Sequence, residues 1–128
     1  MKSETRTWLS FAIENLESSK ILLASQLYNP CLQNVQQSVE KALKAILVEK
    51  KLKITKTHNI LELKYLLESS NIRVILSDDE CDFLNTIYLP SKYPIGSALP
   101  DFDPDETICR DAVEIAERIV NSVKTLLL

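Results

Sequence analysis

Apolar residues recur every three to four positions along most of the chain, and this spacing predicts helices throughout. The clearest stripe has apolar side chains at i, i+4, i+7, i+8 and i+11, which puts one continuous apolar face on a helix; it consists of Val35, Val39, Ala42, Leu43 and Ile46. No strand-like alternation persists, and no repeat or low-complexity segment is present. We therefore expect an all-α protein, an up-and-down bundle of four to five helices, with residues 1–128 forming one domain.

Start and stop signals predict five helices. The first covers about residues 3–28 and is broken by Asn29-Pro30, because proline lacks an amide hydrogen and restricts the residue before it. The second covers about residues 31–51. A third, shorter helix begins at the N-cap residue Asn59, with Glu62 three positions later, and runs to about residue 69.

The fourth predicted helix begins with the same pair of signals, Ser77 followed by Glu80. For the fifth helix we predict Asp103 as the N-cap and Pro104 as the first helical residue, and the helix lasts to the C-terminus. Four of the five prolines and the single glycine lie between positions 89 and 104. This stretch therefore predicts an irregular loop of about 15 residues, a length that is uncommon in compact domains and often functional.

The second predicted helix carries polar residues where charged ones would be usual. Gln36, Glu40 and Lys44 are spaced by four and share a face, and Gln37 is their neighbour. We interpret this face as an accessible polar surface at which another molecule docks. The alternative is that these are ordinary surface glutamines beside one Glu40–Lys44 ion pair.

Composition excludes several classes of function. With one glycine in 128 residues, neither a P-loop nor a GxGxxG motif is possible. The net charge is −3, so a duplex nucleic-acid binder is not expected. The charge is uneven: residues 1–64 contain 10 Lys and Arg against 6 Asp and Glu, whereas residues 65–128 contain 5 against 12.

The remaining composition indicates a cytoplasmic protein without cofactor. Cys31, Cys81 and Cys109 are odd in number and far apart, and they indicate reduced core thiols. No apolar run is long enough for a signal peptide or a membrane span. We expect no metal site, because Asp101, Asp103 and Asp105 lack the glycine and the distant glutamate of a calcium loop.

Four short motifs occur in an order that resembles the HEPN family (higher eukaryotes and prokaryotes nucleotide-binding domain), from about residue 7 to residue 123. They are Trp8 with Ala12, Gln36-Gln37-x-x-Glu40-Lys41-x-x-Lys44, Thr57-His58-Asn59 and Lys92-Tyr93-Pro94. The resemblance implies an all-α bundle that is often a homodimer. It also implies a partner, a minimal nucleotidyltransferase encoded nearby that carries the catalytic carboxylates on its own chain. Val120 and Leu127, beside the apolar stripe of the last helix, agree with a homodimer.

One branch of the HEPN family consists of ribonuclease toxins whose motif is an arginine, four to six residues, then a histidine. His58 is the only histidine in this chain, and the corresponding earlier positions hold Lys51, Leu52 and Lys53. The motif is therefore absent, and we expect no catalytic residues. The family loop usually has arginine before its tyrosine, whereas Lys92 stands here, which keeps the charge but not the bidentate fork.

The candidate residues for binding a ligand or a partner are Gln36, Gln37, Glu40, Lys44, His58, Lys92 and Tyr93. His58 and Tyr93 have structural alternatives, since each could simply pack against the bundle. The leading hypothesis is a non-catalytic HEPN protein of a toxin–antitoxin-like pair that binds a nucleotide, a nucleotidyltransferase or both. The alternatives are a ribonuclease with an atypical residue set and a pure assembly protein.

Overall fold

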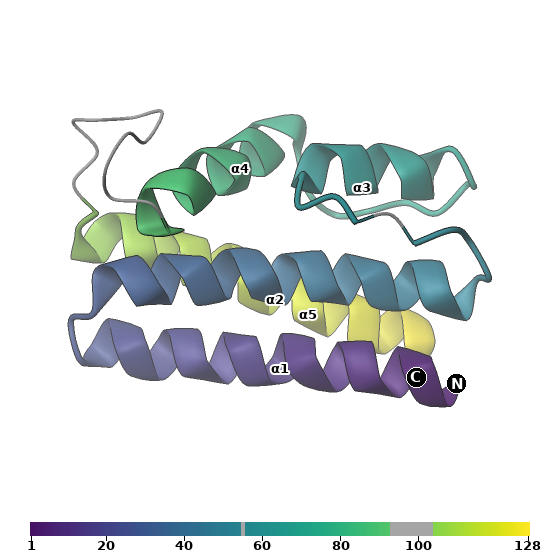
Figure 1. Ribbon diagram of the computed structural model, residues 1–128, viewed down its shortest axis with the longest axis horizontal. Coiled ribbons are helices and arrows are strands. Elements are labelled where there is room, and N and C mark those ends of the chain that lie inside the picture. The colour runs from purple at the N-terminus through teal and green to yellow at the C-terminus, as the bar shows by residue number, and fades with distance from the viewer. Residues whose placement is uncertain (55, 93–103) are drawn as a thin grey trace.

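The structure is a computed structural model that describes residues 1–54, 56–92 and 104–128, and only the backbone of residues 88–92. The described chain forms five helices and no strand: α1 (Ser3–Ala24), α2 (Tyr28–Glu49), α3 (Ile60–Glu68), α4 (Asp78–Lys92) and α5 (Glu106–Leu127). In Figure 1, α1 and α2 lie side by side and antiparallel, α5 packs behind them, and α3 and α4 lie across the other side of α2. This confirms the predicted all-α fold.

Helix α2 is the centre of the bundle and contacts each of the other four helices. Its whole second half is buried, from Ser38 to Val48 with the single exception of Lys41. The predicted stripe of Val35, Val39, Ala42, Leu43 and Ile46 lies in the core. Because neighbours surround α2 on nearly every side, polar residues of this helix are buried together with the apolar ones.

The turn between the first two helices lies earlier than predicted. Helix α1 ends at Ala24, and the chain reverses at residues 25–27, where Gln26 has a φ of 60°. Pro30 does not break a helix but occupies the third position of α2. The first amides of a helix have no intrahelical acceptor, so a proline in the first turn removes no hydrogen bond. The predicted break at Asn29-Pro30 is therefore wrong.

The predicted starts of α3 and α4 are confirmed by their capping hydrogen bonds. The Asn59 side chain accepts from the Glu62 amide at 3.2 Å. At α4 the Ser77 hydroxyl accepts from the Glu80 amide at 3.0 Å, and the Glu80 carboxylate accepts from the Ser77 amide at 2.9 Å. Two amides without helical partners are thereby satisfied at once.

Two predicted limits around the proline-rich stretch are wrong. Helix α4 continues through Pro90 to Lys92, into the predicted loop, because a proline near a helix end removes only one hydrogen bond. Helix α5 begins at Glu106, and its N-cap is Asp105, whose carboxylate accepts from the Ile108 amide at 2.8 Å. Asp103 lies two positions before this N-cap. Tyr93 and the rest of the predicted loop, up to Asp103, lie outside the described residues.

The last helix uses its apolar residues for the bundle itself. Val120 is fully buried and Leu127 packs against the core. These two residues thus pack within this chain, and they give no separate support for a homodimer. The homodimer itself stays a prediction.

Burial makes the three cysteines poor nucleophiles. Cys31, Cys81 and Cys109 are free and buried. Loss of solvation raises the pKa of the Cys81 thiol to about 11 and that of the Cys109 thiol to about 12, and it also raises the pKa of Cys31. The thiolate is the reactive form, so the native thiols hold their protons at neutral pH.

Replacing Ser77 by alanine should lower the free energy of unfolding by about 1 kcal/mol, because the α4 cap loses its side-chain acceptor. Urea unfolding followed by circular dichroism measures this. The matched control is Ser10→Ala in the exposed middle of α1, which should leave stability unchanged or slightly raised. Equal effects at the two positions would contradict the role of the cap.

At pH 8 the thiols of the native protein should react with an aromatic disulfide reagent far more slowly than those of protein unfolded in guanidinium. Unfolding should make all three thiols reactive at once. The physical reason is the high thiol pKa combined with burial. A spectrophotometric thiol titration measures both rates. Rapid modification of even one thiol in the folded protein would refute this description of the core.

Candidate functional site

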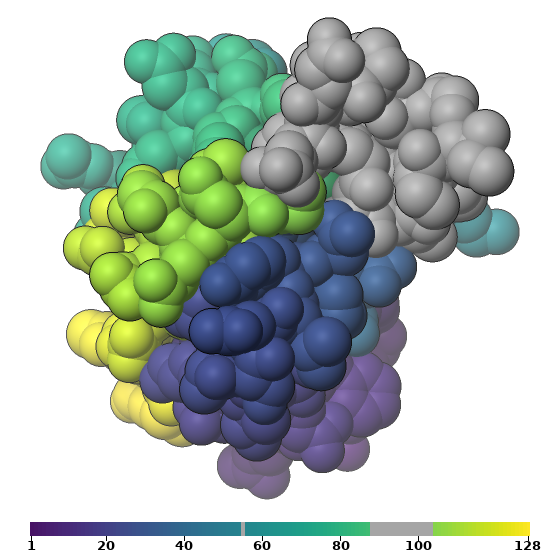
Figure 2. Space-filling model, turned by 90° about the vertical axis from the view of Figure 1, so that its left-hand side faces the viewer, coloured from purple at the N-terminus to yellow at the C-terminus, as the bar shows by residue number. Residues whose placement is uncertain are grey.

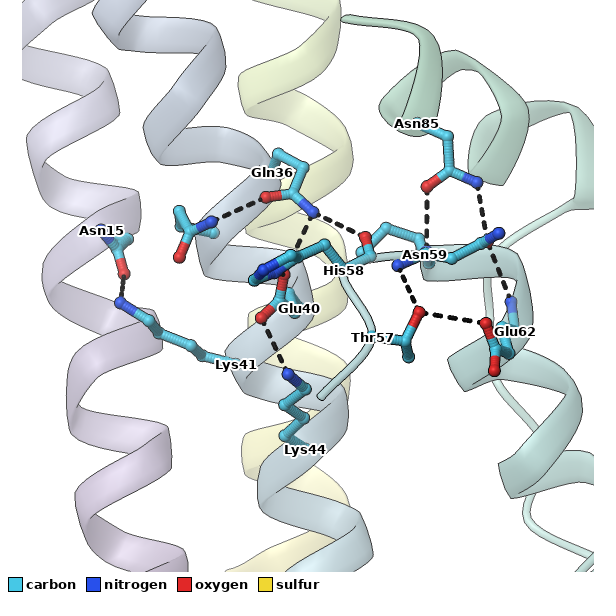
Figure 3. Close-up of polar contacts among 12 residues, drawn as sticks. Asn15, Gln36, Glu40, Lys41, Lys44, Thr57, His58, Asn59, Glu62 and Asn85 are labelled. Atoms are coloured by element: carbon cyan, nitrogen blue, oxygen red, sulfur yellow. Dashed lines mark hydrogen bonds and ion pairs between the residues drawn. The ribbon is translucent and has the colours of Figure 1, made fainter. Parts of the chain in front are cut away.

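The residues predicted on α2 come together where α1, α2 and the segment before α3 meet (Figure 3). Gln36, Glu40 and Lys44 are at most 5% exposed. The interpretation of this side of α2 as an accessible surface is therefore wrong, because the segment carrying His58 lies over it. In the structure these polar groups hydrogen-bond to one another and to His58.

Glu40 is the centre of this network. Its Oε2 accepts from the Lys44 Nζ at 3.0 Å, and its Oε1 lies 2.8 Å from the Nδ1 of His58. The Gln36 Nε2 is a weaker donor to the same Oε1, at 3.3 Å. A buried carboxylate is costly unless it is paired and hydrogen-bonded, and here both of its oxygens are occupied.

Gln36 ties the chain before α3 to α2 through a backbone atom. Its Nε2 also donates to the carbonyl oxygen of His58 at 3.0 Å, and its Oε1 accepts from the Gln37 Nε2 at 3.0 Å. One buried amide thus uses both donor hydrogens and its acceptor. The paired glutamines of the sequence are internal connectors, which the surface interpretation did not anticipate.

Lys44 is held from both sides within the bundle. Its ammonium pairs with Glu40 and lies 5.8 Å from the centre of the Trp8 ring on α1. The negative face of an aromatic ring attracts a cation at this distance. One turn earlier, the Lys41 ammonium donates to the Asn15 side chain at 2.9 Å and lies 5.7 Å from the centre of the Phe11 ring.

His58 is the member of the network that faces solvent, with 54% of its side chain exposed. An ionised carboxylate only accepts, so the contact with Glu40 places a hydrogen on Nδ1. The imidazole is thereby fixed on one side by buried groups, while about half of the side chain is exposed. Glu40, Gln36 and Lys44 position this ring but are themselves too buried to contact a ligand.

Neighbouring hydrogen bonds fix the segment on which His58 sits. The Asn59 amide donates to the Thr57 hydroxyl at 3.1 Å, and that hydroxyl donates to the Glu62 carboxylate at 3.0 Å. Asn85 of α4 accepts from the Ile60 amide at 2.9 Å and donates to the Asn59 side chain at 2.9 Å. The sequence analysis did not predict a role for Asn85. The indication in the sequence was that a polar residue directly follows the core position Leu84.

The two other predicted site residues are not brought to the network by any described contact. Lys92 ends α4, and its side chain is not described, while Tyr93 lies outside the described residues. Their role as binding residues stays a prediction. Among residues 1–54, 56–92 and 104–128, no three His, Cys, Asp or Glu side chains gather as they would around a metal ion.

Comparison with protein families identifies the fold. A model described as the HEPN domain matches residues 5–126. This chain belongs to the HEPN family. No curated protein matches the chain, so the family assignment rests on the domain match and agrees with solved structures.

Three solved structures are similar over almost their whole length. TT1696 from Thermus thermophilus is 23% identical with a TM-score of 0.76, covering 98% of this chain and 100% of that one. ST0689, described as an archaeal HEPN homologue, is 24% identical with a TM-score of 0.72 and full coverage of both chains. An HEPN domain protein (tm0613) from Thermotoga maritima is 22% identical with a TM-score of 0.71, covering 94% of this chain and 97% of that one. At these identities the likeness shows the fold.

None of the helices in the described residues is both long and apolar enough to cross a bilayer.

The family match and the structure together establish an all-α HEPN domain. A polar network is buried at its centre and reaches the surface at His58.

Replacing Glu40 by leucine should cost about 3–5 kcal/mol of folding free energy, because Lys44 would stay buried without its counter-charge. Adding Lys44→Met should recover most of this loss, since a well-packed apolar pair often replaces a buried ion pair at little cost. Urea unfolding of the two single variants and the double variant measures the coupling.

The control is the exposed pair between Arg110 and Glu106, 2.9 Å apart on α5, where Glu106→Gln should cost less than about 1 kcal/mol. The description of Glu40 as the centre of the network fails if Glu40→Leu is no more damaging than this surface change.

Proposed function

We propose that this HEPN protein is a non-catalytic binding subunit, which uses the surface around His58 to hold a nucleotide together with a nucleotidyltransferase partner. The observation that carries the proposal is the half-exposed imidazole fixed from behind by a buried carboxylate. It is supported by the absence from the sequence of the Arg-x4–6-His motif that ribonucleases of this family use.

The energetics of the network favour a role beyond stability. Taking Glu40 and Lys44 out of water costs several kcal/mol per ion, and an apolar pair would fill the same space at similar or better stability. Such a pair is useful where it orients another group. Here the oriented group is His58, whose imidazole could hydrogen-bond a nucleotide phosphate or base.

A hollow along α1, which shares no residue with the network of Gln36, Glu40, Lys44 and His58, has a size suited to such a ligand. It measures about 620 Å³ and is lined among others by Phe11, Asn15 and Lys41, and also by the carboxylates of Glu14 and Glu17. Small-molecule sites commonly measure about 300–1,000 Å³. The Lys41 ammonium and the half-exposed Phe11 ring are suited to a phosphate and to a planar base.

The proposal extends to the biological setting. The partner would carry the catalytic carboxylates, the two proteins would form a toxin–antitoxin-like pair in the cytoplasm, and this chain would form a homodimer. These statements rest on the family resemblance, and co-purification with a nucleotidyltransferase encoded beside this gene tests the partner.

Calorimetric titration with a panel of nucleoside mono- and triphosphates should detect binding that weakens at least tenfold in His58→Gln and Lys41→Gln. The glutamine at 58 can still hydrogen-bond Glu40, so the fold is kept while the imidazole is lost. Lys92→Ala tests the predicted role of Lys92 in the same titration.

The matched control is Lys124→Gln on α5, which removes one positive charge from another helix and should leave affinity unchanged. Absence of heat with every nucleotide, with and without the nucleotidyltransferase, would overturn the nucleotide part of the proposal. Formation of the complex in that case would favour the pure assembly protein.

A further inference from the structure

A second surface, formed by α4 and α5, shares no residue with the His58 network. Both helices pack on α2 rather than closely on each other, and Figure 2 shows the start of α5 lying beside α4. A small groove separates their side chains and is lined by Asp79, Glu80, Phe83, Asp111 and Ile115. It measures about 260 Å³, which is below the range of about 300–1,000 Å³ typical of small-molecule sites. A groove of this size suits an inserted side chain better than a nucleotide.

The groove has an apolar floor and an acidic rim. Phe83 and Ile115 pack against the core and form the floor. Glu80 is already paired with Arg118, whose guanidinium lies 2.6 Å from its carboxylate. Asp79 and Asp111 are exposed and have no ion-pair partner in the part of the chain that the structure describes. The rim therefore presents two uncompensated negative charges, one from each helix.

The wider charge distribution adds to this local field. Residues 65–128 contain 12 acidic side chains against 5 basic ones. Of the described acids around the groove, Asp78 is neutralised by Lys64 at 2.8 Å, whereas Asp82 and Glu114 remain exposed without such partners among the described residues. The field at the groove is thus negative beyond its own rim, and it attracts cationic partners.

We propose that the α4–α5 groove docks a basic amphipathic helix of a partner protein, with one large apolar side chain seated on Phe83 and Ile115. Lysine or arginine side chains flanking that anchor would pair with Asp79 and Asp111. An amphipathic helix that lays its apolar face into a groove between two helices is a recurring recognition mode. The charges would set the rate and the specificity of docking, and the anchor would supply the contact that excludes water.

A synthetic helical peptide of about 16 residues, with a central leucine flanked by lysines, is the probe, titrated by fluorescence anisotropy into the full chain. We expect saturable binding that weakens at least tenfold between about 20 and about 300 mM salt, because the rim charges are exposed and become screened. Replacing the central leucine by alanine keeps the charge and should weaken binding at least tenfold. Binding that does not weaken at higher salt, or that does not weaken when the central leucine is replaced, would overturn the proposal.

Variants of the protein distinguish peptide binding at this groove from general attraction to acidic side chains. Asp79→Asn with Asp111→Asn should weaken binding of the leucine peptide at least tenfold. The matched control, Asp82→Asn with Glu114→Gln, removes the same charge from the same two helices outside the groove lining and should leave affinity within twofold. Equal loss in the two double variants would mean diffuse attraction and would overturn the proposal, as would the absence of binding at about 1 mM peptide.

A further variant tests whether peptide binding is independent of the His58 surface. His58→Gln should bind the peptide as the unaltered protein does, whatever its effect on nucleotides. Failure of nucleotide binding would thus leave the groove proposal standing, and failure of peptide binding would leave the proposed function standing. The two double carboxylate variants should retain the helical spectrum and the melting temperature of the parent, since the substituted carboxylates are exposed.

Discussion

The requirement to neutralise the buried carboxylate of Glu40 constrains the centre of this molecule. Its two oxygens need donors, because an unpaired charge in the interior would cost several kcal/mol. One donor, Lys44, comes from the same helix and is brought into reach by the four-residue spacing. A second donor, His58, is 18 positions away and lies on a segment outside any helix. Satisfying Glu40 therefore fixes the path of the chain before α3.

That path determines how the short helices are attached to the long ones. Helix α3 has only nine residues, too few to be stable alone in water. Its apolar side is buried through Ile60, Leu63 and Leu67, and its start is held by the Asn59 cap and by Asn85 of α4. Polar contacts at the start of α3 and apolar contacts along it thus act together, and they place His58 at the edge of the bundle with its ring half exposed.

Sequence patterns predicted the helices well and the exposure of the polar face badly. The i, i+4, i+7 spacing identified the core of α2 because periodicity reports which residues share a face. It does not report whether another segment covers that face, so Gln36, Glu40 and Lys44 were placed on the surface although they are buried. Helix limits failed for a related reason: Pro30 and Asp103 are compatible with several positions near a helix start, and tertiary packing selects among them. The groove between α4 and α5 joins segments that are far apart in the sequence, which no local pattern could reveal.

The burial of Lys44 also changes how the uneven charge should be understood. Lys44 is buried and paired with Glu40, so less positive charge is available on this part of α2 than the sequence suggests. The acidic half is different, because Asp79 and Asp111 stay exposed and uncompensated among the described residues. A partly neutralised basic half and an open acidic half give the molecule a net field that repels free anions at long range. If the chain binds a nucleotide as proposed, short-range contacts must hold it, whereas a cationic protein segment would be attracted from a distance.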